Sequence, residues 1–467
     1  MKHFFKPSGF SDPIMNPLFR RARCVFSAAM LALVVVLIIA HGAQAKPGFS
    51  VIRDVEIENT LKEYGEPIWQ AAGINPDSVH VIIINDPSLN AFVAGGQNIF
   101  FHTGLLQAAE TPEQLIGIIA HETGHISGGH LVRGSSAMKE ASAEAILSMV
   151  LGTAAAVLSG DPGAGAAVIT GGQSIAQRSI LSFSRAQESS ADAAGMRFLD
   201  GAKLTSKGLK EFLEKLSGQE LLPVDRQVEY ARTHPLTQDR IDAVRYHVTE
   251  SPYSDNRSSK HIYDLHERMR AKLLGYLKPE SALLRFAEKD TRLSARYARA
   301  IAYYRKGDVD KAIKAMAALS KEEPSNPYFY ELLGQIYFEN GDMDNAISAY
   351  KKAVQLKPDA GLMEASYGHA LLEGRNDSNL DEAIVRLNES LKTEPRESST
   401  WRFLATAWGR KNDEGMVAYC LAEEALSKGD IGSAHKMAER ALKLLPKRSS
   451  YVIRAQDIKQ TRNEDEE

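Results

Sequence analysis

The fold of the first half of the chain is decided by one stretch, residues 111–130, which reads TPEQLIGIIAHETGHISGGH. Thr111 and Pro112 are typical of a helix N-terminus, where Thr caps the helix and Pro occupies its first position. Apolar residues then lead directly into the HExxH motif of residues 121–125. We therefore predict a helix that carries this motif and buries its apolar face.

The HExxH motif has the spacing of a metal-dependent hydrolase. Residues four apart on a helix share one face, so His121 and His125 can bind one ion. Glu122 lies beside them, where a carboxylate can accept the proton of a water molecule. The motif therefore predicts two metal ligands and a catalytic base. The alternative is a pair of surface histidines without a metal.

A tetrahedral zinc site needs a third protein ligand. His130 is one residue short of the third histidine of the metzincin pattern, where Leu131 stands, and we reject it. Glu188 and Asp192 are four residues apart, so one could bind metal while the other accepts the spare N–H of a ligand histidine. Because such acidic pairs are also common on exposed helices, spacing alone does not choose between these two meanings.

HExxH followed some 60 to 70 residues later by ExxAD, with Asn90-Ala91-Phe92 and Gly95-Gly96 upstream, is similar to a known group of enzymes. These are the zincin metallopeptidases that include the HtpX-like and CAAX prenyl endopeptidases. The resemblance covers roughly residues 51–248. It implies one Zn²⁺ per chain and five site residues: the ligands His121, His125 and Glu188, the catalytic base Glu122, and Asp192 behind a ligand.

A signal sequence is predicted at the N-terminus. Arg20, Arg21 and Arg23 precede an apolar run, residues 25–40, and the small residues of Ala43-Gln44-Ala45 follow. This order is typical of a cleaved secretory signal, and the run is short for a membrane span of roughly 20 residues. We expect a periplasmic protein. The alternative is an uncleaved signal that anchors the chain in the inner membrane.

The composition describes an ordinary globular protein. Of 467 residues, 44% are hydrophobic and 25% charged, and the formal net charge is −3. A strongly basic nucleic-acid-binding domain is therefore excluded, and we expect no nucleic-acid partner. Cys24 and Cys420 cannot form a disulfide framework.

The second half is repetitive, with matching small residues, Gly-Asp pairs and prolines 34 residues apart. The positions that recur are Ala300, Gly334 and Gly368; Gly307-Asp308 and Gly341-Asp342; Ala312 and Ala346; and Pro324 and Pro358. This period is the signature of tetratricopeptide repeats, which stack helical hairpins into a solenoid. Between Trp401 and Cys420 the phase slips, and we expect an irregular repeat there.

The predicted fold is an α+β zincin peptidase, mostly helical with a small sheet, followed by an all-α tetratricopeptide-repeat solenoid. The strands of the sheet are expected at residues 79–84, 91–93 and 99–101. The expected divisions are a signal peptide (1–45), a zinc peptidase domain (46–270), repeats (271–458) and an acidic disordered tail (459–467).

The order of signal, peptidase and repeats resembles periplasmic, repeat-carrying peptidases of Gram-negative bacteria. The resemblance implies hydrolysis of misfolded or stalled envelope proteins, outer-membrane proteins above all, and repeats that recruit the outer-membrane assembly machinery. The alternative function is a periplasmic chaperone or assembly scaffold whose peptidase site is mostly latent.

The same resemblance implies a regulatory loop at residues 233–240. In it, His234 occupies the open zinc position and holds the enzyme inactive, and Arg240 lies near the site. The alternative is a plain loop histidine and a surface arginine. The apolar stretch 145–170 fits a flap beside the cleft, a peripheral membrane contact or a buried helical hairpin equally well.

Overall fold

The computed structural model describes residues 50–130, 184–218, 222, 227–374 and 377–461. The predicted signal peptide and the stretch 145–170 lie outside these residues. The last helix, α21 (Ser450–Gln460), extends into the predicted tail, because Ile458 in its final turn is fully buried. The tail is therefore shorter than predicted at its start. Among the described helices, none has the length and apolarity needed to cross a membrane.

A small mixed sheet forms the centre of the peptidase region. Its order is β1 (Val51–Ile52), β2 (His80–Ile84), β4 (Asn98–His102) and β3 (Ala91–Ala94), so that β3 is an edge strand. β2 and β4 are parallel, and β3 and β4 form an antiparallel hairpin. Gly95 and Gly96 close this hairpin at φ values of 59° and 98°, which glycine adopts readily. The three predicted strands are confirmed, and β1 is an addition.

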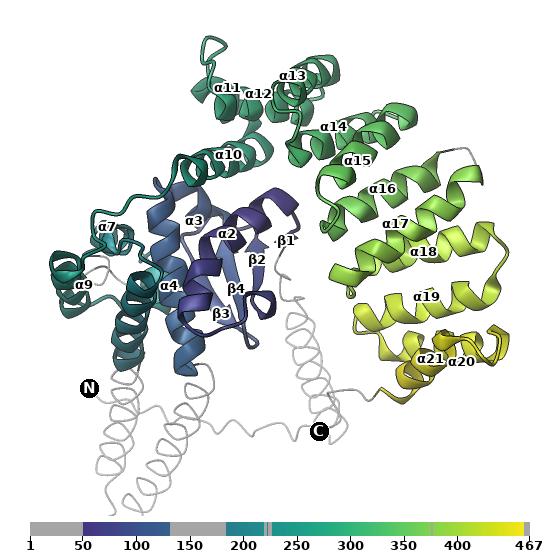
Figure 1. Cartoon of the computed structure of the whole chain (residues 1–467), viewed down its shortest axis with the longest axis horizontal. Coiled ribbons are helices and arrows are strands. Elements are labelled where there is room, and N and C mark those ends of the chain that lie inside the picture. The colour runs from purple at the N-terminus through teal and green to yellow at the C-terminus, as the bar shows by residue number, and fades with distance from the viewer. Residues whose placement is uncertain (1–49, 131–183, 219–221, 223–226, 375–376, 462–467) are drawn as a thin grey trace, which may run out of the picture. The chain divides into compact units, whose positions relative to one another are not determined.

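Helices α2 (Val55–Ala71), α3 (Thr103–Ala108) and α4 (Pro112–Gly128) surround the sheet (Figure 1). A short 3-10 turn, Pro76–Ser78, precedes β2. α2 packs on β2 and α4 packs on β3, and their apolar faces share one hydrophobic core. Thr111 is the N-cap of α4, but its side chain makes no capping hydrogen bond; Gln114 instead accepts one from the backbone N–H of Glu110.

Glycines let the helix of residues 184–201 cross α4 at backbone contact. A Cβ on Gly124 would lie 2.4 Å from the carbonyl oxygen of Ala191, and one on Gly195 would lie 2.9 Å from that of Ala120. Both distances are shorter than a side chain tolerates, so only glycine permits this separation. The crossing sets the distance between the HExxH motif and the acidic pair of the second helix.

Further helices complete this region and lead to the repeats. They are α7 (Lys207–Lys215), α8 (Glu229–Thr233), α9 (Gln238–Glu250), α10 (Lys260–Leu277) and α11 (Pro279–Arg285). α10 packs on α2, α3 and α4 as well as on the first helix of the repeats. The predicted domain boundary after residue 270 falls inside it.

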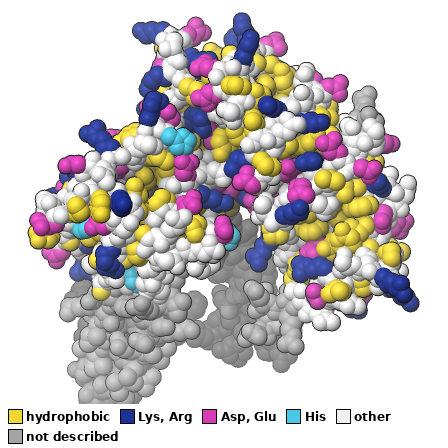
Figure 2. Space-filling model, in the orientation of Figure 1, with side chains coloured by type: hydrophobic (Ala, Val, Ile, Leu, Met, Phe, Trp, Pro, Cys, Tyr) yellow, Lys and Arg dark blue, Asp and Glu magenta, His cyan; other side chains and the backbone are white. Residues whose placement is uncertain are grey.

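Helical hairpins follow through the described residues up to 461, as the 34-residue period predicts (Figure 1). They are α12 (Leu293–Arg305) with α13 (Val309–Glu322), α14 (Pro327–Glu339) with α15 (Met343–Leu356), α16 (Gly361–Glu373) with α17 (Leu380–Thr393), α18 (Ser398–Arg410) with α19 (Glu414–Ser427), and α20 (Ile431–Leu444) with α21. Lys, Arg, Asp and Glu side chains are interspersed on the face shown in Figure 2.

The prediction of an irregular repeat between Trp401 and Cys420 is wrong. α18 and α19 form a regular hairpin, and Asn412 turns between them at φ 58°. Gly307 and Gly341 hold the corresponding left-handed positions at 83° and 81°. Asparagine is the residue that replaces glycine most readily there, so the sequence pattern changes while the backbone does not.

Candidate metal centre

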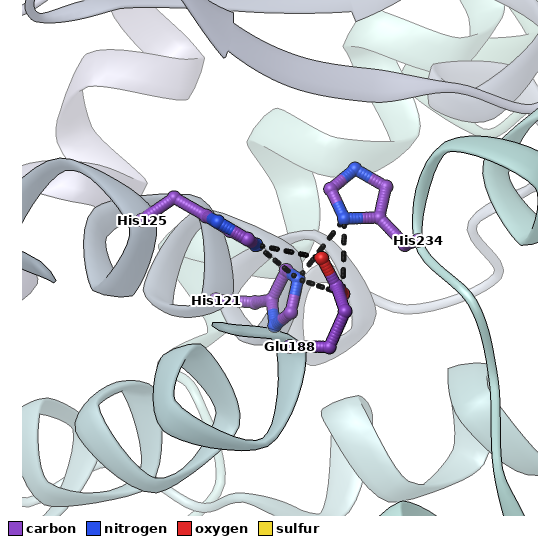
Figure 3. Close-up of side chains that lie close together, drawn as sticks. All are labelled: His121, His125, Glu188 and His234. Carbon is purple, nitrogen blue, oxygen red and sulfur yellow. Dashed lines mark hydrogen bonds and ion pairs between the residues drawn. The ribbon is translucent and has the colours of Figure 1, made fainter. Parts of the chain in front are cut away.

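Two helices and one loop bring four donor side chains together. His121 and His125 project from α4, Glu188 from the helix of residues 184–201, and His234 from the end of α8 (Figure 3). All four residues are buried. The structure therefore groups the three predicted ligands with the predicted regulatory histidine.

The distances between the donor atoms fit one small cation. The Nε2 atoms of His121 and His125 are 3.1 Å apart, and each lies 3.3 Å from a carboxylate oxygen of Glu188. His234 Nδ1 lies 3.3 Å from His121 Nε2 and 3.2 Å from Glu188 Oε2. Tetrahedral ligands at the bond lengths of zinc are about 3.3 Å apart. The donor set and its spacing therefore fit a zinc ion.

Hydrogen bonds orient two of the histidines. His121 Nδ1 is 2.7 Å from Asp192 Oδ1, and because a carboxylate accepts, Nδ1 carries the hydrogen and Nε2 is free to bind metal. His234 Nε2 is 3.1 Å from the carbonyl oxygen of Ala91, which can only accept, so the lone pair of His234 lies on Nδ1. The free lone pairs of these two rings are therefore on His121 Nε2 and His234 Nδ1, the atoms that face the other metal donors.

Arg240 is buried behind the acidic pair, with 2% of its surface exposed. Its Nε and Nη2 atoms donate to the two oxygens of Asp192 at 2.6 and 3.0 Å, and its Nη1 lies 3.1 Å from Glu188 Oε2. Burial raises the pKa of Asp192, but the charge of Arg240 and the hydrogen bond with His121 outweigh it and lower the pKa. Arg240 is thus not the surface arginine of the alternative interpretation.

The surroundings of His121 favour a positive charge. Burial lowers the pKa of its imidazole, but Asp192 and Glu188 outweigh burial and raise the pKa to about 10. The buried carboxylates thus concentrate negative charge at the point where the four donors meet. A bound divalent cation would satisfy the same negative surroundings.

Glu122 differs from the other acidic groups of the site. Both of its carboxylate oxygens are buried, and neither has a hydrogen-bond partner among the described residues. His234 Nε2, at 3.6 Å from Oε1, is too distant for a hydrogen bond. A buried carboxylate without donors is costly, which indicates that a water molecule or substrate group completes it.

Sequence reasoning missed two neighbours of the site. Tyr230 stacks on His234, with ring centroids 4.5 Å apart and planes 25° from parallel. His130, rejected as a ligand, lies outside the four donors; its Nδ1 is 3.0 Å from Nδ1 of His125 and orients that ring. The position of His130 just after HExxH could have indicated that it lies beside the site, whereas nothing in the sequence around Tyr230 indicated this.

Comparisons with known proteins agree with these features. Residues 56–248 match peptidase family M48, and residues 297–361 match a tetratricopeptide repeat. A relative from Yersinia pestis, named beta-barrel assembly-enhancing protease, is 27% identical over 391 residues, 80% of this chain and 77% of the relative. The protein of the same name from Escherichia coli K12 is 25% identical over 418 residues, 88% of this chain and 82% of the relative.

A shorter match is the mitochondrial metalloendopeptidase OMA1 of Schizosaccharomyces pombe, 29% identical over 169 residues, 36% of this chain and 46% of the relative. The predicted zincin-type metallopeptidase and the tetratricopeptide repeats are confirmed by the two family matches. The chain is a metal-dependent peptidase with a repeat region.

Proposed function

We propose that the chain is an exported zinc endopeptidase that hydrolyses misassembled envelope proteins, with outer-membrane β-barrel proteins as the main class. The observation that carries the catalytic part is the pair of buried, unpartnered oxygens of Glu122 beside four converging metal donors. The substrate class rests on the names of the relatives from Yersinia pestis and Escherichia coli.

Each residue of the site has a distinct role in peptide hydrolysis. His121, His125 and Glu188 would hold the zinc ion, which when bound supplies a Lewis acid for the scissile carbonyl and for a water molecule. Glu122 accepts the proton of that water at a carboxylate oxygen and returns it to the leaving amine. Asp192 and Arg240 act through His121 and Glu188, which they hold in position.

The edge strand β3 supports a mode of substrate binding. On its outer side β3 has no partner strand among the described residues, and Ala91 at its start is in contact with His234. An extended polypeptide can add to such an edge through backbone hydrogen bonds. We infer that an unfolded segment of the substrate binds along β3 and crosses the site beside Glu122.

His234 supports the second candidate, a chaperone or assembly scaffold with a latent peptidase. Its Nδ1 completes the set of four donors, and a zinc site with four protein ligands is of the structural, closed kind. In this state Nδ1 takes the position that hydrolysis needs open. We propose that the resting protein is self-inhibited and that movement of His234 opens the peptidase.

The location and partners follow from the rest of the chain. We propose export by the signal peptide of residues 1–45 to the periplasm and recruitment of the outer-membrane assembly machinery by the repeats. Tetratricopeptide hairpins present an extended surface suited to docking proteins, which supports this division of roles. Peripheral membrane contact through residues 145–170 stays a prediction.

The test of the proposed function is Glu122→Gln, in the wild-type chain and in a His234→Ala background. Gln keeps the size of the side chain but cannot accept the proton, so hydrolysis of an unfolded outer-membrane β-barrel protein should fall at least about 100-fold. The zinc content, measured by atomic emission, should stay at one per chain.

Glu110→Gln is the matched control, because Glu110 lies just before α4 and pairs at the surface with Lys215. It should hydrolyse like the parent chain. Turnover retained by Glu122→Gln in both backgrounds would refute the assignment of the base, and absence of metal-dependent hydrolysis in every chain would favour the scaffold.

A further inference from the structure

A second polar cluster lies next to the metal centre and has no part in binding its ion. It joins Asp86 and Ser88, in the loop after β2, with His102 at the end of β4 and Glu229 at the start of α8. Ser88 Oγ lies 2.6 Å from Glu229 Oε2 and 2.7 Å from His102 Nδ1. His102 is buried, whereas Asp86 and Glu229 are about 40% exposed.

The directions of these hydrogen bonds follow from their chemistry. A carboxylate can only accept, so the hydroxyl of Ser88 donates its one hydrogen to Glu229. The oxygen of Ser88 then accepts from His102, whose Nδ1 must carry a hydrogen. The result is a chain of bonds that runs from the buried His102 through Ser88 to α8.

The same residues do not suit a second metal ion. His102 Nδ1 lies 3.7 Å from Asp86 Oδ1 and 3.9 Å from Glu229 Oε2, distances that by themselves could surround a cation. However, the hydroxyl of Ser88 lies within hydrogen-bond distance of both His102 and Glu229. Because Nδ1 of His102 carries a hydrogen in this arrangement, it has no free lone pair with which to bind a metal ion. The arrangement is that of a hydrogen-bond network, in which His102 Nε2 is the one ring atom without a hydrogen-bond partner among the described residues.

The loop that carries Ser88 is firmly held by the end of the sheet. The carbonyl of Asp86 accepts hydrogen bonds from the N–H of Gly104 and the hydroxyl of Thr103. A Cβ on Gly104 would lie 2.1 Å from the carbonyl oxygen of Pro87, so only glycine permits this contact. The loop is therefore a fixed platform against which another segment can dock.

The segment 229–234 docks on this platform residue by residue. Beyond the contact of Glu229 with Ser88, the N–H of Tyr230 donates to the carbonyl of Leu89 at 2.9 Å. Thr233 Oγ1 lies 3.2 Å from Asn90 Oδ1, and His234 donates to the carbonyl of Ala91 at 3.1 Å. The last of these contacts places His234 among the metal donors.

We propose that Ser88, His102 and Glu229 form a latch that holds the segment 229–234 on its platform, and so sets how often His234 leaves the metal centre. The latch is a positioning device, because none of its three residues is among the four converging donors. Its bond from Ser88 to Glu229 involves a charged carboxylate, and hydrogen bonds to charged groups are the stronger ones. The proposal rests on the proposed function, since it concerns control of the same peptidase.

The test uses the full chain with Ser88→Ala or Glu229→Gln, and casein as the unfolded substrate. Loss of one hydrogen bond that exists only in the docked state should raise the open population, and hydrolysis with it, about five- to tenfold. Amide exchange of residues 230–234 should quicken in the same variants. The zinc content should stay at one per chain.

Three controls separate a latch from a general structural effect. Ser88→Thr keeps the hydroxyl and should restore wild-type hydrolysis. Asp242→Asn makes the acid-to-amide change on α9, where the side chain bonds Arg245 and Gln238, and should leave hydrolysis unchanged. In a His234→Ala background neither latch variant should raise hydrolysis further, because the histidine that the latch positions is gone.

Several results would overturn the latch. One is hydrolysis by Ser88→Ala and Glu229→Gln equal to that of Asp242→Asn; others are a decrease, or a rise that persists without His234. Two zinc ions per wild-type chain and one per Glu229→Gln chain would replace the latch with a metal site. The proposed function fails on a different measurement, namely equal hydrolysis by His234→Ala chains with and without Glu122→Gln.

Discussion

Gly124→Ala should separate the two helices that build the metal centre without changing any ligand. The new Cβ would lie 2.4 Å from the carbonyl oxygen of Ala191, whereas ordinary van der Waals contact begins at 3.4 Å. The contact is with backbone, so no side-chain rotation relieves it. The helix of residues 184–201 must therefore retreat by about 1 Å, the difference between these two distances.

The effect on the metal follows from that distance. Glu188 lies 3.3 Å from the Nε2 atoms of both His121 and His125, and metal–ligand bonds tolerate deviations of about 0.2 Å. A retreat of about 1 Å exceeds this tolerance several times. Mutation of a residue that only hydrogen-bonds a metal ligand already lowers metal affinity about 10- to 100-fold. Because Gly124→Ala displaces a ligand itself, we expect zinc affinity to fall at least about 100-fold.

The assay is competition for zinc with a chromophoric chelator, together with casein hydrolysis by the His234→Ala chain with and without Gly124→Ala. Gly409→Ala is the matched control, because the nearest atom to its Cβ, in Val417, is 3.7 Å away. That variant should bind zinc like the wild type, and alanine should stabilise its helix by up to about 1 kcal/mol. Zinc affinity of Gly124→Ala within threefold of wild type would refute the reasoning.

Two further outcomes are expected. Glu188→Ala should leave two imidazoles in place of a three-ligand set, and the purified chain should lose stoichiometric zinc; full zinc content would indicate a different third ligand. Burial lowers the pKa of His266 to about 4 from 6.5, so its contribution to stability is complete above pH 6.5 and is lost as the pH falls toward 4. Between pH 6.5 and 4 the wild-type chain should therefore lose up to about 3 kcal/mol more of its free energy of unfolding than His266→Gln does. Urea melts across this pH range measure the difference, and the same pH dependence in both chains would contradict the prediction.

Local sequence patterns predicted the parts of the site that lie on single helices. His121 and His125 share a face of α4, and Glu188 and Asp192 share a face of the following helix, as their spacing of four residues requires. What the spacing could not give is the contact between the two helices. That contact depends on Gly124 and Gly195, and no local pattern pairs those glycines.

The parts that sequence analysis missed are assembled from separate segments. The latch draws Ser88, His102 and Glu229 from three places in the chain, and each alone is an ordinary polar residue. Arg240 is expected near the site only from the family resemblance, and its contacts with Asp192 and Glu188 are defined only by the folded chain. Buried polar networks are defined by their partners, and those partners are fixed only when the chain has folded.

A buried ionic network also limits how far the peptidase and the repeats are separable. Glu56, on α2 of the peptidase region, lies 2.8 Å from Arg268 and 3.3 Å from Lys272 on α10, and accepts a hydrogen bond from Tyr297 of the first repeat helix. Burial raises the pKa of Glu56, but Lys272 and Arg268 outweigh it and lower the pKa, so the carboxylate is charged and depends on these partners. A chain that ends at the predicted boundary of residue 270 would lose Lys272 and Tyr297 and leave Glu56 with Arg268 alone. Because removing one partner of a buried ion pair costs about 3 to 5 kcal/mol, the ionic contacts make α10 and the first repeat helix part of the peptidase's own structure.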